Sequence, residues 1–518
     1  MNCRTISVVA GAFFLIALSS CKKQLLEVNT NPTATTGSSY DPNFLLTTAQ
    51  LMYTGSTDFG AENWQTEWGE IAGFIQHVSS INTAYYSGDK YLNSVGNFGV
   101  YFDHAYIYQV QPVVELYQLT LNKPQYQNLH QMARIMKALV FERLTDIYGD
   151  IPYFQAGLGY YSRIYAPVYD KQQDIYTDLL KEVSQATDSL AEGADQPTGD
   201  VFYSSAADQI AEWKMFGNTL LLRIAMRLTK VDPTTAQMYA TKVQGLTMSS
   251  NNDNAIVQHE LGSETQNRDA WSILQEDSTD LKLCSTYIDS LQFNNDPRLP
   301  MMSEIFATED TTSADQLGLP PGFILGGSNP ATDITQTPTY PAVLGMEGYS
   351  RLNDNILSYT APNLILTYAE SEFLLADAAK RWGIGGSASA ATHYQNGVLA
   401  AITQLAAFGP ASTISGAQAQ AYLDAHPYND ADGLSQINTQ FWLSTVMNEY
   451  EAWFNWRRTG YPALTPTNFT GNVTGGTIPR RLEYPTSEKV TNGVNYNAAV
   501  SLLQGGDLLT SRMWWDTN

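Results

Sequence analysis

Apolar side chains recur at helical spacing over much of this chain. Three stripes are clear, at residues 132–147, 175–190 and 213–228. In each stripe an apolar residue returns after three or four positions, so the apolar side chains cover one face of a helix. Pro152 and Gly193 follow the first two stripes, and such residues are typical of helix ends. The pattern predicts three long amphipathic helices.

Three further helical patterns follow, at residues 362–382, 391–408 and 436–458. The predicted helices come as pairs of about 15 to 20 residues, in the size range of tetratricopeptide-like units. No strict sequence period links the pairs, so the repeats are degenerate. The chain is therefore expected to be mainly α, with stacked helix pairs as a rigid scaffold and loops that carry recognition.

Between residues 247 and 359 the helical periodicity fails. Gly, Pro, Ser, Thr, Asn and Asp crowd this segment, for example at 251–254 (NNDN) and 320–322 (PPG). We expect a long irregular insert that carries short strands. A loop-rich insert of this length within a compact domain is usually functional.

The N-terminus has the features of an exported lipoprotein. Arg4 precedes an apolar and small-residue run at 6–18, which is too short to span a bilayer comfortably, and Leu18-Ser19-Ser20 leads into Cys21. This order predicts a signal peptide at 1–20 and acylation of Cys21. The alternative is an ordinary secretory signal with an incidental cysteine. A polar tether at 21–40 and a single domain at 41–518 would follow.

Composition narrows the ligand class. The chain has 28 Lys and Arg against 51 Asp and Glu, a net charge of -23, which disfavours nucleic acid and anionic lipid as partners. Charged residues make up only 15%, whereas 31 Tyr and 10 Trp raise the aromatic fraction to 12%. This balance favours neutral, hydrogen-bonding ligands such as sugars. Large helical cores also consume aromatic residues. The mature chain would keep one cysteine, Cys284, so no internal disulfide is expected.

No catalytic, metal or cofactor motif stands out. His259-Glu260 lacks the second histidine of a zinc HExxH motif, and the acidic turn at 430–433 lacks acids at both ends of a calcium loop. Glu67 and Glu70 could share one helix face as a glycosidase pair, but such acids are usually solvated. We therefore predict no enzyme, no metal and no cofactor, with a surface glycosidase as a remote alternative.

Seven segments in order resemble the SusD/RagB family of nutrient-binding outer-membrane lipoproteins, in particular its second SusD-like branch. They are NTNP at 29–32, LTDIYGDIPY at 144–153, AEWKMFGNTLLLRIAMRL at 211–228, NDPRLP at 295–300, LTYAESEFLLADAA at 366–379, YEAWFNWRRTGYP at 450–462 and IPRRLEYP at 478–485.

The resemblance implies a fold, a place and a partner. Family members have tetratricopeptide-like helix pairs, sit on the outer face of the outer membrane and cover a SusC-like TonB-dependent β-barrel transporter. Their ligands are mostly oligosaccharides, although some relatives handle peptides. The resemblance therefore implies cell-surface binding of a nutrient oligomer, with an oligosaccharide as the expected ligand, and its delivery to the transporter. An oligopeptide-binding protein of the same type is the alternative.

Ligand-contact residues have to be inferred from loops. Trp64 and Trp68 lie four apart on a predicted helix, and Tyr85-Tyr86 lies in a polar segment close to Gly88. Adjacent aromatic residues in such a segment are typical of a stacking platform. Core packing is the competing interpretation of each ring. A second set of candidates lies in the insert, at Trp271, Phe323, Tyr349 and Arg351.

Overall fold

The computed structural model describes residues 40–57, 60–262, 265–276, 280–386 and 389–517. The chain divides into two compact units, Met1–Pro42 and Asn43–Asn518, and all helices and strands described below belong to the second. The predicted signal peptide, Cys21 and the predicted tether as far as residue 39 lie outside the described residues. Within the described part, none of the helices combines the length and the apolar character that crossing a membrane requires.

Helices make up the first half of the second unit. Two stretches are π-helices, η1 (Glu62–Ile71) and η3 (Tyr106–Val110). The α-helices of this half are α2 (Asn43–Tyr53), α3 (Ala72–Phe74), α4 (Val95–Ala105), α5 (Gln111–Thr120), α6 (Gln127–Tyr148), α7 (Gly159–Ser162), α8 (Gln172–Ser189), α9 (Gln209–Arg227) and α10 (Pro233–Val243).

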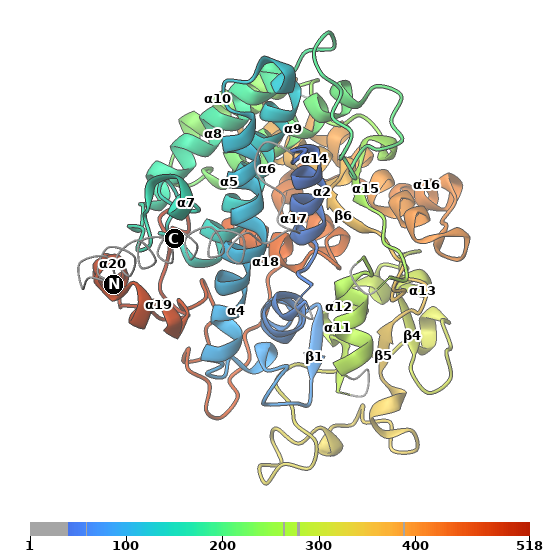
Figure 1. Ribbon diagram of the computed structural model, residues 1–518. Helices are drawn as coiled ribbons and strands as arrows, with labels where there is room; N and C mark the ends of the chain where they lie inside the picture. The colour runs from blue at the N-terminus through green and yellow to red at the C-terminus, as the bar shows by residue number, and fades with distance from the viewer. Residues whose placement is uncertain (1–39, 58–59, 263–264, 277–279, 387–388, 518) are drawn as a thin grey trace, which may run out of the picture. The chain divides into compact units, whose positions relative to one another are not determined.

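The three predicted apolar stripes lie on α6, α8 and α9. Leu139, Leu179 and Leu220, one from each stripe, are completely buried. Consecutive helices pack side by side, α5 on α6, α6 on α8, α8 on α9 and α9 on α10, as Figure 1 shows. At Gly217 of α9, an added Cβ would lie 2.1 Å from the Thr187 hydroxyl, so the Thr187 side chain of α8 packs directly against the backbone of α9. The prediction of a mainly helical, tetratricopeptide-like fold is confirmed.

The later helices of the unit are mostly short. They are α11 (Arg268–Glu276), α12 (Ser285–Phe293), α13 (Leu299–Met302), α14 (Tyr368–Trp382), α15 (Ser389–Thr403), α16 (Gly416–Ala425), α17 (Gly433–Ser444), α18 (Glu449–Thr459), α19 (Thr486–Thr491) and α20 (Gly493–Val500).

Two of the late helix predictions are wrong in detail. The helix expected at 362–382 begins only at Tyr368, because Asn363–Leu366 pairs with a strand and the Thr367 side chain caps the helix. The helix expected at 436–458 is two helices, α17 and α18, separated by Met447 with a φ of 76°. A left-handed residue cannot continue a right-handed helix.

Within the described residues, six short strands form three separate antiparallel pairs. β1 (Val78–Ser80) pairs with β3 (Leu281–Leu283), β2 (Ala255–Val257) with β6 (Asn363–Leu366), and β4 (Ser303–Ile305) with β5 (Ser350–Leu352). The segment 247–359 thus contains the short strands that its composition indicates. It also contains α11 and α12, which its sequence did not predict.

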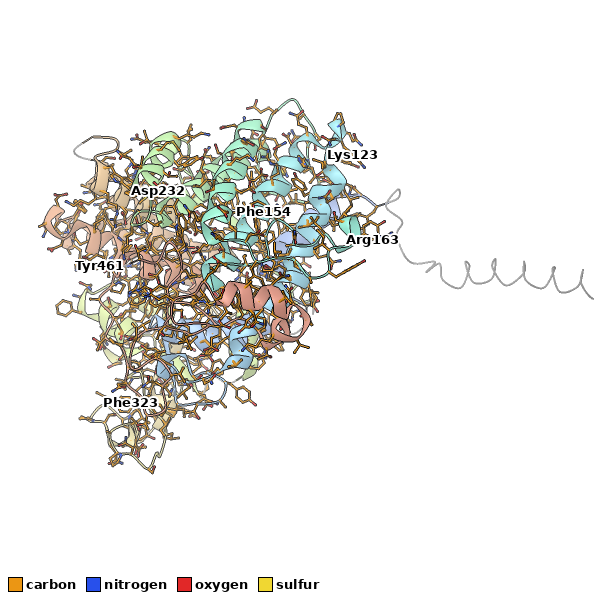
Figure 2. The ribbon with its side chains drawn as sticks, turned by 90° about the vertical axis from the view of Figure 1, so that its left-hand side faces the viewer. Lys123, Phe154, Arg163, Asp232, Phe323 and Tyr461 are labelled. Atoms are coloured by element: carbon orange, nitrogen blue, oxygen red, sulfur yellow. The ribbon has the colours of Figure 1, made fainter. Side chains whose placement is uncertain are left out.

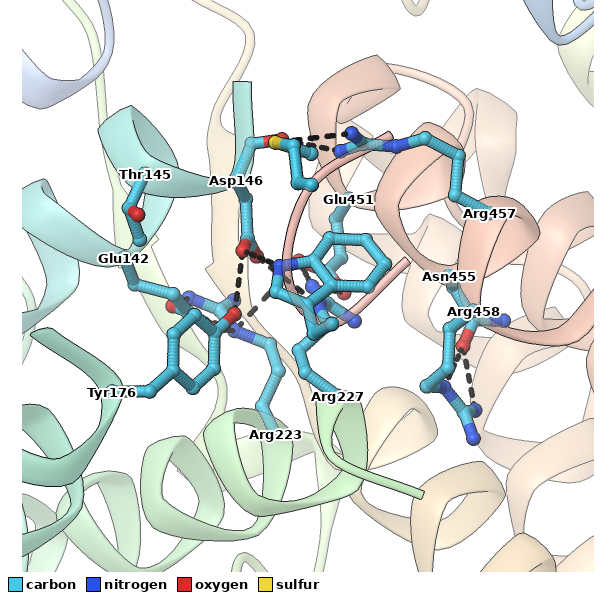
Figure 3. A network of polar contacts seen from close by, with 12 residues as sticks. Glu142, Thr145, Asp146, Tyr176, Arg223, Arg227, Glu451, Asn455, Arg457 and Arg458 are labelled. Carbon is cyan, nitrogen blue, oxygen red and sulfur yellow. Dashed lines mark hydrogen bonds and ion pairs between the residues drawn. The ribbon is translucent and has the colours of Figure 1, made fainter. Parts of the chain in front are cut away.

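A network of buried charges joins four helices and the C-terminal segment (Figure 3). On α9, the Arg227 guanidinium donates to Asp146 of α6 at 3.0 Å and to both oxygens of Glu451 of α18 at 2.5 and 2.6 Å. One turn earlier, Arg223 donates to Glu142 of α6 at 2.5 Å. These side chains are at most 4% exposed.

Neutral donors complete this network. Asp146 also accepts from the Tyr176 hydroxyl of α8 at 2.5 Å and from the Trp515 indole at 2.8 Å. Removing one partner from a buried ion pair is costly, because the remaining charge loses its compensation without regaining water. The network therefore fixes the relative positions of α6, α8, α9 and α18.

We expect Arg227→Met to lower the free energy of unfolding by about 3 to 5 kcal/mol. The substitution leaves Glu451 with a 3.7 Å contact to Arg223 in place of its two short hydrogen bonds. Chemical denaturation measures the change. Lys242→Ala is the control, because it removes a largely exposed ion pair with Asp188 and should cost less than about 1 kcal/mol. Equal losses in the two variants would contradict the assigned role of the network.

Candidate functional site

Pairing of β1 with β3 brings two loops together at the surface. Beyond the last strand pair, the Ile81 amide donates to the Asp280 carbonyl at 3.3 Å, and the Asn82 side-chain amide donates to the Asp280 carboxylate at 3.1 Å. The Asn82 side-chain oxygen in turn accepts from the backbone amides of Ala84 and Tyr85 at 2.7 and 3.1 Å. This Asx-type turn sets the course of the backbone into Tyr85.

Tyr85 and Trp64 form a pair of accessible rings. The Tyr85 side chain is 52% exposed, and Trp64 on η1 is half-buried beside it. Their ring centroids are 6.1 Å apart and the ring planes are inclined by 51°. Two inclined aromatic faces at this spacing offer a shallow angular surface to a flat apolar ligand face.

A buried carboxyl group holds this loop against η1. The Asn97 side-chain amide donates to Glu70 at 2.8 Å and to the Tyr85 carbonyl at 3.3 Å, while the Ser87 hydroxyl donates to Glu70 at 3.2 Å. Glu70 is completely buried. It therefore ties both ends of the Tyr85–Ser87 segment to the helix that carries Trp64.

Two glycines allow the close approach of the loop to η1. A Cβ on Gly69 would lie 2.7 Å from the Tyr85 carbonyl oxygen, and a Cβ on Gly88 would lie 1.9 Å from the Glu70 carbonyl oxygen. Neither distance can accommodate a methyl group without movement of the backbone. The backbone of the loop that carries Tyr85 is thus in direct contact with the backbone of η1, which carries Trp64.

Helix α11 packs against η1, the helix that carries Trp64. The Trp68 indole donates to Asp269 of α11 at 3.1 Å, and Asn63 and Asn363 each donate to the same carboxylate at 2.7 Å. Trp271, two residues further along α11, is half-buried. Trp271 and Tyr85 therefore belong to elements that each contact η1, the helix that carries Trp64.

The other predicted contact residues have structural positions. Trp68, Tyr86 and Tyr349 are 1%, 3% and 0% exposed, so none offers a ring face to a ligand. Tyr349 and the half-buried Phe323 belong to a small separate apolar cluster with Leu319, Ile334 and Met346; Figure 2 shows Phe323 in the looped segment at the lower end of the view.

Arg351 is committed to ion pairs. Its guanidinium lies 2.6 Å from Glu304 and 2.7 Å from Asp354, and the residue is 8% exposed. Of the eight predicted residues, Trp64, Tyr85 and Trp271 remain as candidates. Asn82, Glu70 and Asn97, which hold the loop that carries Tyr85, were not predicted in this role. The run of polar residues around Tyr85 hinted at a turn but not at its partners.

The paired carboxylates that a glycosidase would need are not accessible at Glu67 and Glu70. The two residues are 4% and 0% exposed. Glu67 accepts the backbone amide of Glu449 at 3.0 Å, and burial, with nearby Asp269, raises its pKa well above the usual value. Both carboxyl groups serve the packing of η1. In the described part of the chain, no three His, Cys, Asp or Glu side chains gather closely enough to hold a metal ion.

The stacked helix pairs define a class of mainly helical, tetratricopeptide-like proteins. The chain belongs to the second SusD-like family, described as "Starch-binding associating with outer membrane", which it matches over residues 35–485.

Solved structures agree with this family. A chitin-binding protein is 33% identical, with a TM-score of 0.81 over 92% of this chain and 100% of its own. A Bacteroidetes SusD-like protein is 26% identical, with a TM-score of 0.78 over 92% and 100% of the two chains. A SusD homologue from Bacteroides uniformis shares the fold at 22% identity, with a TM-score of 0.73 over 93% and 99%. No curated protein sequence matches the chain.

The buried carboxyl group of Glu70 makes the stability of the folded protein depend on pH. Burial raises the pKa of Glu70 from 4.5 to about 8, so the folded protein retains a proton that the unfolded chain has lost. The stabilising contribution is therefore complete below about pH 4.5 and disappears as the pH rises to about 8. Glu70→Gln removes this dependence while keeping an uncharged side chain of the same shape.

We expect the melting temperature of Glu70→Gln, relative to the wild type, to rise steadily between about pH 5 and about pH 8. Thermal unfolding across this range measures the difference. The exposed Glu192→Gln is the matched control and should follow the wild type at every pH. A constant offset for Glu70→Gln would mean that Glu70 titrates normally in the folded protein.

Proposed function

We propose that this protein binds a neutral oligosaccharide at the cell surface, with Trp64 and Tyr85 as the stacking platform and Trp271 at its edge. The inclined, partly exposed ring pair is the observation that carries the proposal. Membership of a family described as starch-binding and 33% identity with a chitin-binding protein support a glycan ligand. Chitin and starch oligosaccharides are therefore the first ligands to test.

The platform suits weak, reversible binding. A sugar ring that stacks on one aromatic face buries modest apolar area, and at about 25 cal/mol per Å² one ring contributes roughly 1 to 2 kcal/mol. This corresponds to about a five- to thirtyfold change in affinity. A shallow site with two such contacts releases its ligand readily, as a protein that passes its ligand onward requires.

We expect Trp64→Ala and Tyr85→Ala each to weaken oligosaccharide binding about five- to thirtyfold, measured by calorimetry with chitin and starch oligosaccharides. Tyr85 is half exposed, so Tyr85→Ala should leave the melting temperature unchanged. Tyr160→Ala, which removes an 89% exposed ring elsewhere, is the matched control. Undiminished glycan binding by the Trp64→Ala, Tyr85→Ala double variant, or binding of peptides in place of glycans, would reject the proposal.

We further propose that Cys21 carries the lipid anchor and that a SusC-like TonB-dependent β-barrel transporter receives the ligand. The sequence around Cys21 and the family support the anchor and the partner. One surface of the described chain also fits a protein partner. Tyr160, Tyr165, Val490 and Val494 are each more than 80% exposed.

Hydrogen bonds join the two segments that carry these side chains. Asn492 donates to the Pro167 carbonyl at 2.9 Å, and the Tyr169 hydroxyl donates to Glu488 at 2.8 Å. Tyr and Val exposed together are typical of protein interfaces, whereas Val gives a sugar no ring to stack on. Arg163, at the edge of the unit in Figure 2, lies in the same loop. This surface is where we expect the transporter to dock.

Solubilisation of cell membranes in mild detergent should recover the protein together with a large β-barrel, because permanent interfaces often bury more than about 2,000 Å². Val494→Asp should reduce recovery of the barrel, since it places a charge in the proposed interface. Metabolic palmitate labelling of the same preparation checks the anchor, and Cys21→Ala should lose the label. Repeated recovery of the wild-type protein alone would count against the partner, and a labelled Cys21→Ala variant against the anchor.

A further inference from the structure

A groove opens where α12 ends, apart from the Trp64–Tyr85 ring pair. It has a volume of about 730 Å³, within the range of ligand-binding clefts. Its lining includes Asp289, Gln292, Phe293, Asn295, Pro297 and Ser313. Residues 295–300 carry the NDPRLP motif, which the proposed function does not otherwise use.

Phe293 is a large ring without a packing role. It is the last residue of α12 and is 87% exposed, whereas Tyr287, Ile288 and Leu291 of the same helix are completely buried. The core side of α12 is thus filled by other residues. A phenylalanine held almost fully in water beside a groove presents a free aromatic face.

Hydrogen bonds hold both walls of the groove, partly buried on one side and buried on the other. On one side, the Gln292 side-chain amide donates to the carbonyls of Ser313 and Gln316 at 2.8 and 2.9 Å. On the other side, the Arg298 guanidinium donates to Asp296 at 2.9 and 2.6 Å, and to Gln440 of α17 at 2.8 Å. A ligand would therefore meet a preformed surface and would not have to order it.

The free polar groups define the ligand chemistry. Among the described residues, neither the Asp289 carboxylate nor the Asn295 side-chain amide has a hydrogen-bond partner, and both side chains are exposed. The described residues that line the groove include no lysine, arginine or histidine, which disfavours phosphate, sulfate and carboxylate ligands. A carboxylate acceptor, an amide and an aromatic face together suit the hydroxyls and the apolar face of a neutral sugar.

We propose that this groove is a second subsite for a neutral oligosaccharide, with Phe293 as its stacking residue and Asp289 and Asn295 as its hydrogen-bonding residues. The inference rests on the proposed glycan-binding function and adds a site to it. Chain geometry places the two sites close enough for one polymer. From Asp280 at the first site, β3 and α12 lead directly to Phe293, a path of roughly 30 Å at most.

Two linked subsites predict a particular dependence on ligand length. A polymer that occupies both sites gains from the high effective concentration of its second segment, whereas a disaccharide binds each site separately. Loss of one subsite should therefore weaken polymer binding strongly and leave disaccharide binding at the other site unchanged.

Binding of a soluble chitin polymer and of the N-acetylglucosamine disaccharide, or of their starch counterparts, tests the proposal. We expect Phe293→Ala to weaken polymer binding at least about tenfold, to halve the stoichiometry for the disaccharide and to keep the wild-type melting temperature. Weak disaccharide binding should persist in the Trp64→Ala, Tyr85→Ala double variant and vanish when Phe293→Ala is added. Tyr160→Ala, an equally exposed ring, is again the control.

The outcomes separate the two proposals. Wild-type polymer affinity in Phe293→Ala, alongside weakened binding in Trp64→Ala, would overturn the second subsite and leave the first. A wild-type protein that binds none of these glycans would overturn the proposed function itself. Equal losses in Phe293→Ala and Tyr160→Ala would also reject the groove, because the effect would then follow from any exposed aromatic residue.

Discussion

Two buried arginines on α9 determine how the rest of the scaffold can be arranged. Arg223 and Arg227 are one turn apart, and their partners Glu142, Asp146 and Glu451 come from α6 and α18. A charge in the interior is tolerated only where its partner lies at hydrogen-bond distance, so each pair fixes a relative position as well as an energy. Apolar stripes alone would allow neighbouring helices to slide past one another. The ion pairs prevent this movement, because it would separate the buried charges.

A related pair secures the second half of the unit. Asp377 of α14 accepts from Arg458 of α18 at 3.0 Å. Burial alone would raise the pKa of Asp377, but Arg458 and Arg381 lower it to about 2. Helix α18 therefore contacts charged partners on both sides, through Glu451 toward α9 and through Arg458 toward α14. Helix α18 therefore contributes to both halves of the scaffold. Its Trp- and Arg-rich segment is buried because the charged side chains find partners in both halves.

The sequence was sufficient for the scaffold and insufficient for the site. Long amphipathic helices such as α6 and α8 can be predicted from the sequence, because the 3.6-residue period of their apolar positions is visible without knowing which helix they pack against. The break at Met447 and the short strand at 363–366 depend on tertiary pairing and left no comparable signal. Trp68 and Tyr85 illustrate the same limit. Both lie near Gly in polar surroundings, yet Trp68 meets Asp269, 201 positions away, and is buried. The Tyr85 side chain lies beside the Trp64 ring and remains half exposed.

The close contacts of Gly69 and Gly88 fix the backbone of the loop that carries Tyr85 but leave its exposed side chains free to vary. The backbone at Tyr85 and Glu70 lies against these two glycines with no room for a methyl group, so the course of the loop is fixed. The side chains at residues 83–85 nevertheless face solvent and take no part in that contact. Substitutions there would change the shape and chemistry presented to a ligand without disturbing the fold. At the proposed site, single replacements of side chains could therefore change the ligand while the backbone keeps its course.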